Sequence, residues 1–291
     1  MTPDAGTLLL TPYRRAVPAR KLAREIGLTL SALPAPVTWP GGVVSFTFDD
    51  FPKSALAVGG DILERYGARG TYYTSMKLAQ SQTQLWPMFN DRDIRAAHRA
   101  GHEIACHTYT HPDLRNLAKP MILAEVRNNA TALSSLIEGF LPTNFAYPYG
   151  CVSTKAKSVL RSWFSSCRGI VRGINHGLVD LAELLAMPLY AEDFDSAEMC
   201  RLIERTCSLD GWLIFFTHDV TGTPSPFGCK PGQLEAVVAY AAERSTILPV
   251  RDVFASLPYF NPFVARYRFA SKALKEHWRR LARRLCMSGI H

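Results

Sequence analysis

Short apolar runs alternate with amphipathic stretches from about residue 42 to residue 257 of the chain. The apolar runs are rich in Val, Ile, Phe and Tyr, and they predict strands over residues 43–48, 70–74, 103–106, 144–147, 167–171, 212–217 and 246–250. The stretches between them have helical spacing and predict helices over residues 57–66, 91–100, 122–136, 154–163, 196–206 and 233–243. Such alternation is typical of parallel strands joined by crossover helices.

Strand–helix units in this number favour an α/β fold, a distorted (β/α)7 barrel, over a small open sheet. We expect the barrel domain to occupy residues 41–258. Residues 1–40 show little periodicity and predict an N-terminal arm, with a short helix near residues 19–25. Residues 259–291 carry apolar residues every three or four positions between basic ones, which predicts a basic amphipathic C-terminal helix.

Composition narrows the class of protein. The 291 residues are 47% hydrophobic and 20% charged, which is ordinary for a globular protein. No apolar run reaches the roughly 18 residues of a membrane-spanning helix, and the apolar residues 7–10 are too short for a secretory signal. We therefore expect a cytoplasmic protein. The seven cysteines are scattered without a CxxC pair, which argues against a disulfide framework or a zinc knuckle.

The net charge of +8 is unevenly distributed. Residues 259–291 contain eight Lys or Arg and one Glu, residues 1–40 contain five and two acids, and the body between them carries −2. A nucleic-acid-binding body is disfavoured, because phosphate contacts need a basic stripe. The basic tail has two interpretations: peripheral adsorption to an anionic membrane, or docking of its apolar stripe on the barrel.

Acidic and imidazole side chains follow three of the predicted strands. Asp49 and Asp50 follow the first strand, His107 and His111 follow the third, and His218 follows the most apolar one. The HxxxH spacing predicts two imidazoles on one face of a helical turn, within reach of one metal ion. With Asp50 they would form a two-His, one-carboxylate site with open positions for water and substrate. The alternatives are a turn or cap for the Asp pair and a buried structural role for His218.

The sequence Tyr147-Pro148-Tyr149-Gly150 has turn chemistry, since Pro fixes one φ angle and Gly permits close backbone approach. Such a turn can direct a backbone N–H at a developing oxyanion. A plain turn is the alternative.

Together these segments resemble the polysaccharide deacetylase family, which is also described as the nodulation protein B homology domain or carbohydrate esterase family 4. The resemblance rests on residues 47–50 (TFDD), residues 101–104 with 107–111 (GHEI and HTYTH), residues 147–150 (YPYG) and the apolar strand before His218. It extends from about residue 42 to residue 257. It implies a distorted (β/α)7 barrel and metal-dependent removal of an N-acetyl group from an aminosugar.

The resemblance also implies roles for individual residues. Asp49 is the implied general base, His218 the general acid, and the Tyr149 N–H a donor to the oxyanion. One divalent ion, expected to be Zn2+ with Co2+, Ni2+ and Mn2+ as alternatives, is the implied partner of Asp50, His107 and His111. The residues expected to contact substrate are Tyr147, Pro148, Phe216 and Arg172.

Two departures from the family pattern concern the site. Family members often carry an Arg two residues before the Pro of the YPYG segment, where it pairs with the base; here Ala146 occupies that position. Arg168 and Arg172 are the candidates to replace it. The usual Asp- and Trp-rich fourth motif is missing, and residues 172–177 (RGINHG) stand in its place.

The resulting hypothesis is a cytoplasmic metal-dependent deacetylase of an N-acetylglucosamine-type sugar. Its expected substrate is an oligosaccharide, a polysaccharide precursor such as those of exopolysaccharide assembly, or a lipid-linked aminosugar. The alternatives are a deformylase of a lipid-linked aminosugar, which a small pocket around Phe216 would favour, and a non-catalytic glycan- or membrane-binding relative. The expected partners are a glycan and, through the tail, an anionic membrane, but no nucleic acid.

Overall fold

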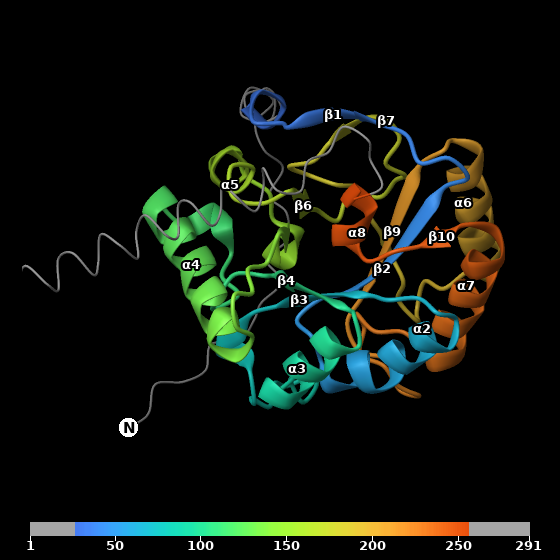
Figure 1. Ribbon diagram of the computed structural model, residues 1–291, viewed down its shortest axis with the longest axis horizontal. Helices are drawn as coiled ribbons and strands as arrows, with labels where there is room; N and C mark the ends of the chain where they lie inside the picture. Colours follow the sequence, from blue (N-terminus) through green and yellow to red (C-terminus); the bar gives the residue numbers. More distant parts are fainter. Residues whose placement is uncertain (1–26, 256–291) are drawn as a thin grey trace, which may run out of the picture.

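A computed structural model of the chain describes residues 27–255 (Figure 1). The short helix expected near residues 19–25 and the basic helix expected over residues 259–291 lie outside these residues. Within the stretch expected to form the N-terminal arm, residues 34–37 form β1 (Pro34–Val37), which pairs antiparallel with β7 (Gly177–Asp180). Among residues 27–255, no helix combines the length and apolarity that crossing a bilayer requires.

Seven parallel strands curl into a barrel in the order β6-β5-β4-β3-β2-β9-β8. Their bounds are β2 (Val43–Phe48), β3 (Thr71–Thr74), β4 (Glu103–Cys106), β5 (Asn144–Ala146), β6 (Ser166–Arg168), β8 (Met187–Pro188) and β9 (Trp212–Thr217). Arg168 also forms a parallel bridge with Leu184, three residues before β8, so the two edges of the sheet meet. The structure thus confirms the predicted distorted (β/α)7 barrel.

The seventh barrel strand is not the one that the sequence predicts. The apolar run at residues 246–250 forms only β10 (Thr246–Ile247), which pairs with the first two residues of β2 and lies off the main strand order. The place beside β9 belongs to β8, a two-residue strand that contains Pro188. So short a strand shows no alternation of polar and apolar residues, which is why its sequence does not reveal it.

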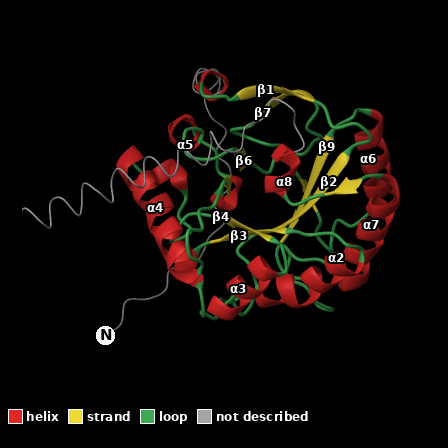
Figure 2. Cartoon of the chain, viewed as in Figure 1, coloured by secondary structure: helices red, strands yellow, loops and turns green. Residues whose placement is uncertain are grey.

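Helices cover the outside of the barrel (Figure 2). Their bounds are η1 (Ala55–Gly60, a π-helix), α2 (Asp61–Arg65), α3 (Asp91–Arg99), α4 (Lys119–Leu136), α5 (Thr154–Leu160), α6 (Ser196–Ser208) and α7 (Pro231–Arg244), with short 3-10 turns η2 (Met76–Leu78), η3 (Leu114–Asn116) and η4 (Pro148–Gly150). Capping explains where α3 begins: Asn90 accepts hydrogen bonds from Arg92 N and Asp93 N. One further helix, α8 (Val250–Ala255), lies across the barrel opening in Figure 1.

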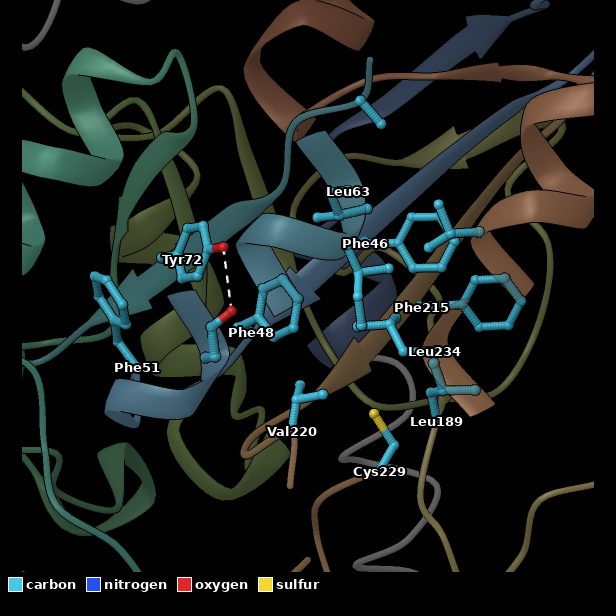
Figure 3. Close-up of a cluster of buried hydrophobic side chains, with 14 of the residues drawn as sticks. Phe46, Phe48, Phe51, Leu63, Tyr72, Leu189, Phe215, Val220, Cys229 and Leu234 are labelled. Carbon is cyan, nitrogen blue, oxygen red and sulfur yellow. Dashed lines mark hydrogen bonds between the residues drawn. The ribbon is translucent and has the colours of Figure 1, made fainter. Parts of the chain in front are cut away.

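Alternation along the strands separates an apolar outer face from a more polar interior. In β2, Phe46 and Phe48 belong to the cluster of buried side chains that also contains Leu63 of α2 and Leu234 of α7 (Figure 3). Phe48 stacks on Tyr72 of β3 with ring centroids 4.9 Å apart. The intervening residues of β2 are polar and continue to Asp49, so the same period of two that builds the core directs this carboxylate into the barrel.

Candidate metal and catalytic site

Asp50, His107 and His111 converge where β2 and β4 end. Their potential ligand atoms all lie within 4.8 Å of one another. Asp50 Oδ1 lies 3.2 Å from His111 Nε2 and 3.7 Å from His107 Nε2. These three residues are the set that the sequence nominated as metal ligands.

The two histidines meet through an irregular loop, which corrects the expected helical turn. Thr108 and His111 adopt left-handed backbone angles, with φ of 68° and 57°. His111 precedes Pro112, and a residue before proline is disfavoured in the right-handed helical region. The imidazoles are therefore neighbours, with ring centroids 4.8 Å apart, for a reason other than helical spacing.

A hydrogen bond to the backbone fixes the tautomer of His107. Its Nδ1 lies 2.8 Å from the carbonyl oxygen of Ala146, which accepts the ring N–H and leaves the Nε2 lone pair facing Asp50. Burial, reinforced by the neighbouring His111, lowers the pKa of His107 to about 4. The ring is thus neutral near pH 7, as a metal ligand must be.

The residues fit a divalent ion. Asp50 Oδ1 is buried and accepts no hydrogen bond from any described residue. A buried acceptor without a donor costs about 1–3 kcal/mol, and a cation beside it would remove that penalty. One carboxylate and two imidazoles form a donor set that suits zinc and similar ions.

The backbone around the site is strained. Among the described residues, seven non-glycine residues have positive φ, and five of them are Asp50, Phe51, Thr108, His111 and Tyr149. Such conformations carry a free-energy cost and gather at functional sites. Their concentration at one end of the barrel supports the assignment of this end as the working face.

Arg168 of β6 is the partner of Asp49. Its Nη2 donates a hydrogen bond to Asp49 Oδ1, and both side chains are buried. Burial raises the pKa of Asp49, but Arg168, His107 and His218 together outweigh it and the pKa is lowered. Asp49 is therefore a carboxylate near neutral pH.

The structure thereby decides between the two arginines. Arg168 supplies the guanidinium beside Asp49 that the family pattern would place at residue 146, where this chain has Ala146. Its guanidinium carbon lies 4.9 Å from the centroid of the Phe216 ring. Arg172, in contrast, is exposed and its guanidinium lies 4.0 Å from an Asp193 carboxylate oxygen. Arg172 thus takes part in a surface ion pair, while the Phe216 side chain is buried next to Arg168.

His218 follows β9 and is only partly buried, so it is not a core histidine. Its Nδ1 lies 3.2 Å from the carbonyl oxygen of Phe227, which leaves Nε2 available for proton exchange. The rings of Trp86 and Phe227 lie 5.5 and 5.7 Å from it, measured between centroids. These rings give the site an apolar wall.

The YPYG turn places its residues in different surroundings. Tyr149 is left-handed and half-exposed, its ring centroid lies 4.5 Å from that of His111, and within residues 27–255 no acceptor is bonded to its N–H. Pro148 is buried beside it.

The Tyr147 side chain packs in the core, and its hydroxyl donates to Ala182 O, so it is not placed to contact substrate. Gly150 has a φ of 61°, which favours glycine, and a Cβ there would lie 2.2 Å from Ile170 Cγ1, so another residue would also displace the Ile170 side chain.

Residues 172–177 do not take the place of the missing motif. Asn175 N donates to the carbonyl oxygen of Trp212, the first residue of β9, at the end of the barrel opposite the site. The residue near the site is Tyr190, which follows β8 and has its ring centroid 5.6 Å from that of Phe216. Burial, with Asp49 nearby, raises the pKa of the Tyr190 hydroxyl. Sequence reasoning missed Tyr190 because it missed β8.

Comparison with known proteins places this chain among proteins of similar sequence and fold. Residues 37–163 match the family described as polysaccharide deacetylase. This match, which spans somewhat less than half of the chain, makes the chain similar to the polysaccharide deacetylase family. Among curated members, a chitin deacetylase of Colletotrichum lindemuthianum is 25% identical over 176 residues, which is 60% of this chain and 63% of that protein. A probable peptidoglycan-N-acetylglucosamine deacetylase of Arthroderma benhamiae is 32% identical over 108 residues, 37% of this chain and 24% of the relative. The chain therefore spans less than two thirds of the length of these relatives.

Solved structures of deacetylase-family proteins share the fold. The chitin deacetylase of Colletotrichum lindemuthianum superposes with a TM-score of 0.53 at 18% identity, covering 77% of this chain and 91% of that one. A family 4 acetyl xylan esterase of Clostridium thermocellum, in complex with a cobalt ion, gives a TM-score of 0.53 at 19% identity, covering 73% and 90%. At such identities the similarity establishes the barrel.

Proposed function

We propose that this chain is a metal-dependent hydrolase that removes the N-acetyl group from an N-acetylglucosamine-type sugar in an oligosaccharide, a polysaccharide precursor or a glycolipid. One observation carries the proposal: the cluster of Asp50, His107 and His111 lies beside a second carboxylate, Asp49, that is held ionised by Arg168. The curated relatives named as chitin and peptidoglycan deacetylases support a glycan amide as the substrate class.

Each side chain has a task in the hydrolysis. Asp50, His107 and His111 would hold a divalent ion, for which we propose Zn2+, and when bound it would supply Lewis acidity toward the amide carbonyl and lower the pKa of a nearby water. Asp49 accepts a proton from the water as its oxygen attacks the carbonyl carbon. The Tyr149 N–H donates to the carbonyl oxygen as that oxygen becomes negative. His218 then gives a proton to the leaving amine as the C–N bond breaks, and the products are acetate and the free aminosugar.

Product analysis with defined substrates tests the proposal. The full chain is loaded in turn with Zn2+, Co2+, Ni2+ and Mn2+ and incubated with N-acetylglucosamine oligomers and with their N-formyl counterparts. Mass spectrometry is expected to show loss of acetyl groups, with Asp50→Asn as the inactive control. Loss of formyl groups alone would replace the deacetylase by a deformylase. Tight metal binding without hydrolysis of either substrate would instead indicate a non-catalytic glycan-binding protein.

A further inference from the structure

The loop that carries His111 is held from outside by helix α4. Glu125 Oε2 accepts hydrogen bonds from Tyr109 N at 2.9 Å and from Thr110 N at 2.7 Å. Glu125 Oε1 accepts a third bond, from Thr110 Oγ1 at 2.9 Å. Both oxygens of one carboxylate thus bind the two residues that precede His111.

One turn further along α4, Asn129 makes the matching contacts on the neighbouring strand. Its Oδ1 accepts from Met76 N and its Nδ2 donates to Thr74 O, each at 2.9 Å. Residues four positions apart lie on one face of a helix. This face of α4 therefore supplies hydrogen-bond partners to backbone at the ends of both β3 and β4.

The two histidines depend on α4 to different degrees. His107 directly follows β4, and its ring is fixed by the Ala146 carbonyl. His111 lies at the far end of a loop in which Thr108 and His111 itself have left-handed backbone angles, and such conformations persist only where the surrounding structure holds them in place. Within the loop, the His111 N–H donates a hydrogen bond to Thr108 Oγ1 at 3.1 Å. The backbone N–H groups of the two residues between them, Tyr109 and Thr110, donate instead to Glu125.

We infer that Glu125 is a positioning residue for the metal site, which fixes the His111 loop and thereby sets the affinity for the divalent ion. The inference rests on the metal site of the proposed function. Glu125 is not one of the three clustered ligands, and its carboxylate is occupied by the loop. Partners of this kind, one shell beyond the ligands, typically change metal affinity by about 10–100-fold when removed.

The test measures Zn2+ dissociation constants of the full chain by competition with a chromogenic chelator, without any substrate. Glu125→Ala is expected to weaken Zn2+ binding by about 10–100-fold. Glu125→Gln keeps an acceptor for the two backbone amides and is expected to stay within a few-fold of the unmodified chain. If Glu125→Gln loses as much affinity as Glu125→Ala, the carboxylate acts through its charge and the positioning role is wrong.

Asp195→Ala is the matched control. Asp195 Oδ1 accepts from Ala197 N at 2.9 Å and from Glu198 N at 3.2 Å at the start of α6, so its loss also removes carboxylate–amide bonds. This variant is expected to lower the melting temperature and leave the Zn2+ dissociation constant unchanged. An equal loss of melting temperature in Glu125→Ala with unchanged Zn2+ binding would show a merely structural role. If Glu125→Ala does not fold, Glu125→Asp, with its shorter reach, takes its place and is held to the same outcomes.

His111→Ala separates this inference from the proposed function. We expect that variant to lose Zn2+ binding by more than any Glu125 variant. Retention of full affinity in His111→Ala would overturn the metal site itself. Loss in His111→Ala with no change in Glu125→Ala would overturn only the role of Glu125.

Discussion

The two ends of the barrel both bury a carboxylate, and they treat it in opposite ways. At the start of β4, Glu103 Oε1 accepts from Asn144 Nδ2 at 2.6 Å, and Oε2 accepts from Thr71 Oγ1 at 2.9 Å and Arg251 N at 2.8 Å. After β2, at the opposite end, Asp50 Oδ1 is buried and makes no hydrogen bond within residues 27–255, although His111 Nε2 lies 3.2 Å away. A fully satisfied carboxylate contributes to the fold, whereas an unsatisfied one is prepared for a ligand.

The surroundings of the two carboxylates also differ: the Glu103 end of the barrel is covered, whereas the Asp50 end is accessible. At the Glu103 end, α8 covers the opening, and Val250 N donates to Thr71 Oγ1 at 2.9 Å (Figure 1). At the Asp50 end, the loops carry left-handed residues and leave His218 and Tyr149 accessible. The Glu103 end thus contributes to the stability of the barrel. The Asp50 end has strained backbone conformations that lower stability but leave polar side chains accessible to a substrate.

The largest effect is expected at a ligand. His107→Ala removes one of two imidazoles, so it should lower bound metal and amide hydrolysis together, with activity falling to background. Elemental analysis of the purified protein and a product assay measure both quantities. His176→Ala, at an exposed histidine outside the metal cluster, should change neither. Full metal content in His107→Ala would contradict the ligand assignment.

Next in size is the loss of Asp49, the proposed general base. Asp49→Asn cannot accept a proton from the attacking water, so turnover should fall by about 10²–10⁴-fold. Metal content should be unchanged, because Asp49 is not among the clustered ligands. Steady-state rates normalised to bound metal test this. Turnover near that of the unmodified enzyme would remove Asp49 from the mechanism.

A smaller loss of activity is expected when Arg168 is removed and when an arginine is placed at residue 146 instead. Ala146 and Arg168 are paired residues of β5 and β6, so a guanidinium from either position can reach the region of Asp49. Arg168→Met should reduce kcat/KM by about 10²-fold through misorientation of Asp49. Adding Ala146→Arg to that variant should recover part of the loss. A double variant no more active than Arg168→Met would show that β6 is the required origin.

The smallest effect on activity is expected at the other end. Glu103→Gln places an amide N–H2 among donors, so the free energy of unfolding should fall by about 1–3 kcal/mol. The Zn2+ dissociation constant and the turnover of the folded variant should not change. Urea denaturation and chelator competition measure the two quantities. Weaker metal binding in Glu103→Gln would end the distinction between a structural and a functional end.

The local sequence pattern predicted structure correctly wherever a feature depended on the residues of a single strand. The predicted bounds of β2, β4 and β9 coincide with the structure, because short segments rich in apolar residues and bounded by Gly, Asp or His leave few alternative strand limits. The positions of Asp49, Asp50 and His218 follow directly, since each lies just past the end of such a strand. The pairing of His107 with His111 was anticipated, although the helical turn expected to achieve it is absent.

By itself, the sequence determined the barrel and placed Asp49, Asp50 and His218 directly after its strands, while the roles that the resemblance implies for these residues stay predictions. The tertiary structure alone decided that Arg168 meets Asp49 across 119 residues, that β8 brings Tyr190 to the site, and that Glu125 holds the His111 loop. The physical reason is the range of the interactions. A strand or a cap depends on neighbours along the chain, whereas a buried ion pair or a supporting carboxylate depends on which strands and helices become neighbours in space.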